Sequence, residues 1–410
     1  MSQRKPGRHA LLFILITIFI DTLGFGIIIP VLPRLIAELG STSISDAAGY
    51  GGALMFVFAL MQFLFAPVMG NLSDRFGRRP VLLISLATLS VDYLIMGFAP
   101  TLAWLFLGRL LSGASAATFS TANAYIADIT DESERAARFG LVGAAWGVGF
   151  VIGPAAGGLL GELGPRIPFY VAAGLALLNV LYGLLVLPET LSRDKRRPFR
   201  FSRANPIGAL AALRPYPLVL GLFGALVLYF MAHDVNPSVW TYYVLHKFQW
   251  SEGQVGLALA AVGLSSAVVS GTLVGPVVQR LGEARAAYLG LALAAVSFFG
   301  YAFATASWML FPAILAGAFM GLVMPSLRGI MSRTVGERSQ GELQGAISSF
   351  MGLTAIFAPL IMTQTFRYFS MPDASLYFPG ASFFLAGCLA LLAGAVIMLN
   401  LKRERLRTGT

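Results

Sequence analysis

Roughly twelve apolar runs, each close to the length that crosses a lipid bilayer, divide this chain of 410 residues. Hydrophobic residues make up 57% of the sequence and charged residues 12%, whereas a soluble domain carries about 25% charged residues. The runs lack the alternation over about ten residues that is typical of membrane strands. The sequence therefore predicts an all-α membrane protein. The expected spans are Ala10–Ala37, Tyr50–Leu72, Val81–Ala99, Leu102–Tyr125, Phe139–Gly161, Ile167–Leu187, Leu218–Leu245, Gln254–Val278, Ala284–Ala306, Trp308–Met331, Leu343–Tyr368 and Tyr377–Leu401.

The first half of the chain returns in weaker form in the second half. The stretch Gly70–Arg79 reappears 205 residues later as Gly275–Gly282, with two glycines and an arginine at matching places, and Pro154 meets Pro359 at the same offset. Because 205 is half of 410, we expect two six-helix bundles related by a pseudo-two-fold axis. The bundles are expected at 1–187 and 218–410, joined by a cytoplasmic linker at 188–217. Such repeats are typical of transporters whose two bundles rock about a central site.

The basic residues are distributed unevenly along the chain. With the amino terminus placed inside, 23 of the 29 basic residues fall in one set of loops and four in the other, namely Arg34, Arg166, Lys247 and Arg367. This asymmetry follows the positive-inside rule and predicts that both termini are cytoplasmic. The net charge of +10 therefore reflects membrane topology, and we expect no nucleic-acid partner.

Motifs for enzymatic chemistry are missing from the sequence. The single cysteine, Cys388, can form no intrachain disulfide. No set of histidine, cysteine or carboxylate residues has the spacing of a metal site, and no hydrolase motif or nucleotide-binding loop is present. We expect no metal, no cofactor and no enzymatic activity, and ATP-driven transport is disfavoured. The first apolar run is too long for a signal-peptide core and is expected to remain as the first helix.

Three acidic residues lie well inside apolar runs: Asp21, Asp92 and Asp234. A charged side chain at the bilayer centre costs roughly 3 kcal/mol or more and is a functional candidate by default. Burial disfavours an ionised carboxylate, whereas a nearby arginine favours it. A carboxylate under both influences can load and release protons. We therefore expect the three acids, with Arg109 and with His233 beside Asp234, to couple transport to a proton gradient.

Structural roles are open for the same residues. Asp21 or Asp92 could be permanently paired and tether helices without titrating, and Arg109 could serve a structural ion pair. His233 could make an ordinary polar contact between helices.

The fifth span carries Gly149, Gly153, Pro154 and Gly157 at a spacing that lets another helix approach closely. Proline at this place removes a backbone donor, and we expect a bent interface. Aromatic residues on the fifth and seventh spans could line a cavity for planar apolar compounds, although lipid-facing positions are equally open to them. The expected substrate cavity comprises Gln62, Arg109, Asn123, Trp146, Asp234, Asn236 and Trp240.

These motifs resemble those of a known family. Gly70–Arg79 is similar to the helix 2–3 signature of the major facilitator superfamily, Leu107–Gly113 to its helix 4 motif and Gly149–Gly158 to its helix 5 antiporter motif. Within the superfamily, the chain resembles the tetracycline-resistance drug:proton antiporters. That likeness is carried over nearly the whole chain by Asp21–Pro33, Ala59–Phe63, Ser73–Leu83, Asp92-Tyr93, Ala124–Asp131, Ala302–Thr305, Met324-Pro325, Ser332-Arg333 and Gly341–Gly345.

The resemblance implies roles for particular residues. Asp21 and Asp92 match the intramembrane acids of the family, and Arg109 matches its helix 4 arginine. Asp74, Arg78 and Asp128 match a cytoplasmic charge cluster that latches the outward-facing state. The implied gating residues are Gly70, Asp74, Arg75, Gly77, Arg78, Asp128, Gly149, Gly153, Pro154 and Gly157.

The second half departs from the family pattern. Alignment on Ala302–Thr305 places the helix 9 aspartate of the family at Ala294, and its helix 8 histidine falls at Ser266. The seventh span reads Asp234-Val-Asn236-Pro237 in place of a Gln-x-Pro pattern. The second-half acid has therefore moved to the seventh span or been replaced in function.

The sequence as a whole predicts a major facilitator fold and a proton-coupled exporter of small amphipathic or aromatic compounds. It is expected to work by alternating access as a monomer in the bacterial cytoplasmic membrane, with a small-molecule substrate, protons and lipid as its partners. Alternatives are a uniporter, a proton-linked exporter of a metabolite, and a membrane receptor that transports nothing.

Overall fold

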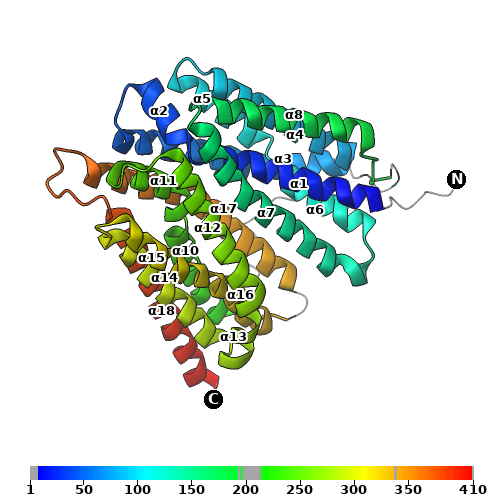
Figure 1. The fold of residues 1–410 in the computed structure, drawn as a ribbon. Helices are drawn as coiled ribbons and strands as arrows, with labels where there is room; N and C mark the ends of the chain where they lie inside the picture. Colours follow the sequence, from blue (N-terminus) through cyan, green and yellow to red (C-terminus); the bar gives the residue numbers. More distant parts are fainter. Residues whose placement is uncertain are drawn as a thin grey trace. The chain divides into compact units, whose positions relative to one another are not determined.

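The computed structural model describes residues 8–192, 194, 196, 213, 215–336 and 339–408 (Figure 1). Within these residues the chain is helical and contains no strand. Twelve helical segments there are long and apolar enough to cross a membrane, which confirms the predicted number of spans.

Several spans are built from more than one helical element. The helical elements of the first half are α1 (Arg8–Ile28), α2 (Leu32–Gly40), α3 (Ile44–Phe76), α4 (Arg78–Phe98), α5 (Leu102–Ala114), α6 (Thr118–Ile129), η1 (Glu132–Glu134), α7 (Arg135–Gly161) and α8 (Ile167–Val186). Those of the second half are α10 (Pro217–His233), α11 (Val235–Lys247), α12 (Glu252–Val268), η4 (Val269–Leu273), α13 (Val274–Leu281), α14 (Glu283–Phe303), η5 (Ser307–Met309), α15 (Leu310–Ala318), η6 (Phe319–Leu322), α16 (Val323–Thr334), α17 (Gln340–Ser370) and α18 (Ala381–Thr408).

The prediction of one continuous first helix over Ala10–Ala37 is wrong. Helix α1 ends at Ile28, and α2 begins at Leu32 after a short turn. Pro30 and Pro33 lack the backbone N–H that would continue the helical ladder through this region. The fourth and seventh spans are also interrupted, at Ser115–Ala117 and at Asp234.

The chain forms two compact units. The first contains Met1–Ala47, Val57–Ala204 and Trp250–Ala260, and the second contains Ala48–Phe56, Asn205–Gln249 and Ala261–Thr410. Each unit is thus built mainly from one half of the sequence. The expected linker at 188–217 lies largely outside the described residues, so its bounds stay a prediction.

In the first unit, α7 lies against α1 along a row of glycines (Figure 1). A Cβ atom added at Gly149 would lie 2.9 Å from the carbonyl oxygen of Phe19, and one added at Gly153 would lie 2.8 Å from that of Leu23. A Cβ at Gly157 would meet the backbone of Ile27. The close helix approach predicted for this motif is therefore confirmed, because only hydrogen fits between the two backbones.

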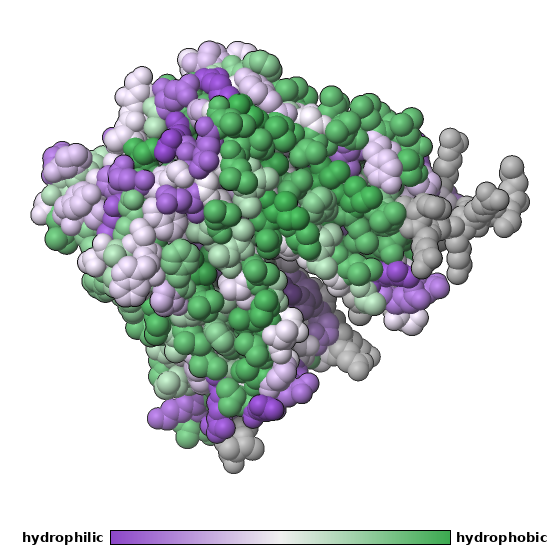
Figure 2. All heavy atoms as spheres, in the orientation of Figure 1, coloured by the Kyte–Doolittle hydropathy of each residue, from purple (hydrophilic) through white to green (hydrophobic). Residues whose placement is uncertain are grey.

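Large apolar side chains lie on the outer sides of the helices as well as between them. Leu185 is 86% exposed and Phe98 69% exposed. In Figure 2 hydrophobic residues cover most of the visible helix sides, while hydrophilic residues gather near helix ends. A surface this apolar is typical of helices that lipid covers.

Candidate proton-coupling and gating sites

An ion pair joins α4 to α5 inside the first unit. The Nη2 group of Arg109 donates to Oδ2 of Asp92, whose side chain is fully buried. Arg109 also contacts the sulfur of Met96 at 3.1 Å, and its guanidinium carbon lies 5.5 Å from the ring centre of Phe58. Asp92 and Arg109, which the sequence analysis singled out separately, are thus brought together. A paired Asp92 fits the tethering alternative, because breaking a buried pair leaves an uncompensated charge.

Asp21 has a different environment on α1. Its Oδ1 atom, like that of Asp92, is buried and has no hydrogen-bond partner among the described residues. One turn further along, a Cβ added at Gly24 would lie 3.3 Å from the ring of Tyr93 on α4. The ring of Tyr93 therefore reaches α1 within one turn of Asp21. Unlike Asp92, Asp21 forms no salt bridge with a cation among the described residues.

In the second unit, Asp234 occupies the break between α10 and α11. Its backbone carbonyl accepts hydrogen bonds from the N–H of Ser238 at 3.2 Å and from the hydroxyl of the same residue at 2.5 Å. The neighbouring His233 is exposed, and its ring centre lies 6.0 Å from that of Tyr229. Among the described hydrogen bonds, none joins the His233 ring to the Asp234 carboxylate, so proton sharing between them stays a prediction.

The residues expected to line a substrate cavity lie in unlike environments. Trp146 is 45% exposed and stacks on Phe150, with ring centres 5.2 Å apart. Trp240 is buried in the second unit, and its ring meets those of Tyr301 and Phe383 edge-on at 4.9 Å and 6.3 Å. Gln62 is exposed, whereas Asn123 and Asn236 are half-buried. Their membership of one cavity stays a prediction.

A cavity of about 480 Å³ lies elsewhere in the first unit, at loop ends. Arg34, Glu38, Glu162 and Glu252 line it together with the Gly161–Pro165 turn, and Arg34 pairs with Glu252 at 2.7 Å. None of the predicted substrate-cavity residues is among its lining residues.

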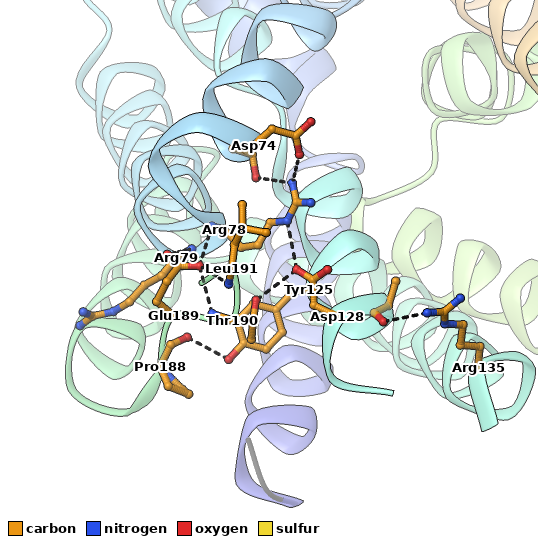
Figure 3. A network of polar contacts seen from close by, with 12 residues as sticks. Asp74, Arg78, Arg79, Tyr125, Asp128, Arg135, Pro188, Glu189, Thr190 and Leu191 are labelled. Atoms are coloured by element: carbon orange, nitrogen blue, oxygen red, sulfur yellow. Dashed lines mark hydrogen bonds and ion pairs between the residues drawn. The ribbon is translucent and has the colours of Figure 1, made fainter. Parts of the chain in front are cut away.

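The predicted cytoplasmic cluster is assembled around Arg78, the first residue of α4 (Figure 3). Its Nη1 group donates to Asp74 at 2.6 Å and to the hydroxyl of Ser73 at 3.1 Å. Its Nε group donates to Asp128 at 3.2 Å. One guanidinium thus connects the end of α3, the start of α4 and the end of α6, and bridging of this kind uses the fixed fork geometry of arginine.

Gly77 makes the sharp turn from α3 to α4 possible. Its φ and ψ angles are 113° and 163°, a region that is essentially restricted to glycine. Its N–H donates to the carbonyl of Ser73 at 3.1 Å and closes α3. Gly282 has the matching geometry in the second unit, with φ 77° and ψ 160°.

The other predicted gating residues show weaker constraints. Arg75 is exposed, and its guanidinium lies 5.1 Å from the ring centre of Phe76. A Cβ at Gly70 would meet no atom within 4 Å, so packing does not explain a glycine there.

Four residues of the cluster were not foreseen from the sequence: Arg79, Tyr125, Glu189 and Thr190. The Glu189 carboxylate accepts from the N–H groups of Arg78 at 2.9 Å and Arg79 at 3.2 Å, and the Thr190 hydroxyl donates to Asp128 at 3.3 Å. The available signal was Pro188-Glu189-Thr190 directly after the sixth span, which the sequence analysis assigned to the linker.

The profile of the Major Facilitator Superfamily matches residues 14–246 and 222–409, and hence more than half of the chain. The chain belongs to the major facilitator superfamily. It is 41% identical over 357 residues to tetracycline resistance protein, class C, of Escherichia coli, covering 87% of this chain and 89% of that protein. It is 40% identical over 364 residues to tetracycline resistance protein, class G, of Vibrio anguillarum, covering 87% and 90%.

A solved structure supports the major facilitator fold. The nucleoside transporter NupG superposes with a TM-score of 0.78 at 12% identity, covering 96% of this chain and 99% of that chain. This likeness concerns the fold alone. As a superfamily member the chain is a multi-pass membrane transporter of small molecules and not an enzyme.

Proposed function

We propose that this transporter exports drugs in exchange for protons, with tetracycline-class compounds as the first candidate substrates. The single observation that carries the coupling is Asp21, a half-buried residue on α1 whose carboxylate oxygen Oδ1 is buried and has no described partner. Similarity to two tetracycline resistance proteins at about 40% identity supports the substrate class. The proposed setting is the bacterial cytoplasmic membrane, with both termini cytoplasmic and the monomer as the working unit.

The physical argument concerns the cost of an isolated charge. An ionised carboxylate without a partner is expensive inside a membrane, whereas the same group is neutral once it has bound a proton. Alternating access would expose Asp21 to one side of the membrane at a time. Proton uptake from outside would then favour one arrangement of the bundles, and release inside would favour the other.

Asp234 is the proposed second-half carboxylate. Ala294, where the family pattern places an acid, is buried and apolar in α14. Asp234 instead lies in the interruption between α10 and α11, and interrupted membrane helices are where transporters commonly place ion and substrate sites.

The test uses purified protein in liposomes with labelled tetracycline and an imposed pH gradient. Wild type should accumulate the drug. Asp21→Asn should lose gradient-driven accumulation while keeping exchange of labelled for unlabelled drug, because exchange needs no net proton movement. Asp234→Asn should behave similarly if it is the second coupling site. Asp373→Asn, an exposed acid outside the spans, is the matched control and should resemble wild type.

Undiminished gradient-driven accumulation by Asp21→Asn would refute the coupling role. The uniporter alternative, favoured by the apolar Ala294 position, predicts that wild type equilibrates the drug and never concentrates it. No movement of tetracycline in either assay would remove that substrate class.

A further inference from the structure

The segment that leaves α8 is bonded to the cytoplasmic cluster at several points (Figure 3). The Tyr125 hydroxyl donates to the carbonyl of Pro188 at 3.0 Å, and the Arg79 guanidinium donates to the carbonyl of Leu184 at 2.7 Å. Leu191 is buried. The start of the connection between the two halves is therefore held on α4 and α6.

Glu189 makes the central contact of this segment. Its carboxylate accepts hydrogen bonds from four backbone N–H groups, two at the start of α4 and two in its own segment. The first two belong to Arg78 and Arg79, and the other two belong to Thr190 and Leu191, both at 3.0 Å. The first N–H groups of a helix have no partner within the helix, and a carboxylate there also complements the helix dipole.

The same contact fixes the direction of Arg78. The N–H of Arg78 is held by Glu189, while its guanidinium reaches Asp74 and Asp128. Asp128 also accepts from Thr190, the residue next to Glu189. The backbone N–H of Arg78 and one acidic partner of its guanidinium are thus both tied to a single two-residue segment.

We propose that Glu189 is a positioning residue for gating, which acts through Arg78. By holding the amino end of α4, it keeps the Arg78 guanidinium within reach of both carboxylates and couples the connection between the halves to that cluster. This role rests on the proposed function only in that the cluster changes during transport, and it does not depend on which drug is carried.

The test combines transport with a substrate-free measurement. Glu189→Gln keeps the shape of the side chain but loses the charge, and we expect about a ten-fold slower drug exchange at unchanged KM. Hydrogen–deuterium exchange at the Arg78 and Arg79 amides should accelerate. Glu134→Gln is the matched control: Glu134 is a cytoplasmic-side acid that pairs with Arg138 at 3.0 Å, and its variant should stay near wild type in both measurements.

A double-mutant cycle separates positioning from general stability. Because both residues act on Arg78, Glu189→Gln combined with Asp128→Asn should be no slower than the slower single variant. Glu189→Asp keeps the charge but shortens the side chain, and about three-fold slowing is expected if the glutamine variant fails to fold. Two outcomes would overturn the proposal. One is that the two substitutions slow drug exchange multiplicatively in the cycle. The other is that a variant exchanges drug at the wild-type rate although its Arg78 and Arg79 amides exchange hydrogen faster.

A failure of the Glu189 proposal can be distinguished from a failure of the proposed proton coupling. Drug exchange at equal pH needs no proton gradient, so the cycle can be measured even if gradient-driven accumulation is absent. Should the chain not carry tetracycline at all, the cycle is run on thermal unfolding and amide exchange, where additive effects of the two substitutions would count against the proposal.

Discussion

The α3–α4 turn of the first half and the α13–α14 turn of the second half share a backbone conformation but differ in charge. At the offset of 205 residues, Gly77 corresponds to Gly282, and both adopt positive φ angles before the next helix begins. Arg78 then corresponds to Glu283, and Asp128 to Arg333. Each half pairs its two residues, Arg78 with Asp128 and Glu283 with Arg333, so the ion pair is retained with its polarity reversed. The position of the pair is therefore more constrained than the sign of its charges.

The reversal explains why Glu189 is needed in one half. Glu283 puts a carboxylate in the first turn of α14, which complements the helix dipole. Arg78 puts a positive charge at the matching place on α4, which the dipole disfavours. Glu189 supplies the missing negative charge from another segment.

The halves also differ inside their spans. Asp92 and Arg109 correspond to Ser297 and Ile314, both buried, and Asp21 corresponds to Leu226. Asp234 corresponds to Ile29, which lies in the turn between α1 and α2. The interruption is therefore common to both halves, while charge inside it belongs to the second half alone. At this offset, the charges inside the spans are therefore not repeated between the halves.

The largest expected effect comes from giving the first half the residues of the second. Asp92→Ser or Arg109→Ile alone should lower stability by about 3–5 kcal/mol, because the remaining charge is buried without its partner. The double variant should recover part of this loss but should not transport. Thermal unfolding of the purified protein measures the stability.

Ser90→Ala is the control for that series, since it removes one neutral hydrogen bond from the same helix and should cost about 1 kcal/mol. A double variant less stable than either single would contradict an ion pair as the basis of the effect.

A medium effect is expected at the two turn glycines. Alanine at Gly77 or Gly282 should cost about 1–3 kcal/mol in backbone strain. At Gly77 the new methyl group also meets the Glu189 carboxylate, whereas at Gly282 it meets no atom within 4 Å. Gly77→Ala should therefore slow drug exchange more than Gly282→Ala, and equal slowing would show that Glu189 contributes nothing beyond the turn.

The smallest effect is expected at the reversed pair. The Arg333 side chain is 69% exposed and that of Glu283 15% exposed, and ion pairs with a solvent-exposed partner contribute about 0–1 kcal/mol. Glu283→Gln should therefore change drug exchange less than Asp128→Asn, which disturbs an arginine with several partners. A larger effect of Glu283→Gln would make the second-half pair the dominant latch.

The twelve spans could be predicted from the sequence because a membrane-spanning helix needs an apolar run of a characteristic length, which is visible in the sequence. Helix interruptions were harder to predict. Pro33 and Pro237 each lack the N–H that would reach back four residues, to Ile29 and His233, so two of the breaks carried a signal. The break at Ser115–Ala117 follows residues with no such signal.

Within the candidate site, the sequence showed that Asp92 and Arg109 lie inside membrane spans. It could not show that their side chains point toward each other. Pairing depends on how α4 and α5 are rotated about their axes, which apolar runs do not encode. Glu189 was missed for a related reason. Two of its four hydrogen bonds join segments about 110 positions apart in the chain, and a charged residue after a span is usually solvated.

The row of glycines on α7 limits how this protein can evolve. Gly149, Gly153 and Gly157 leave no room for even one methyl group beside α1, so natural variants at these positions should be rare. Adaptation to new compounds is expected instead at neighbouring side chains that do not touch this seam, such as the exposed ring of Trp146.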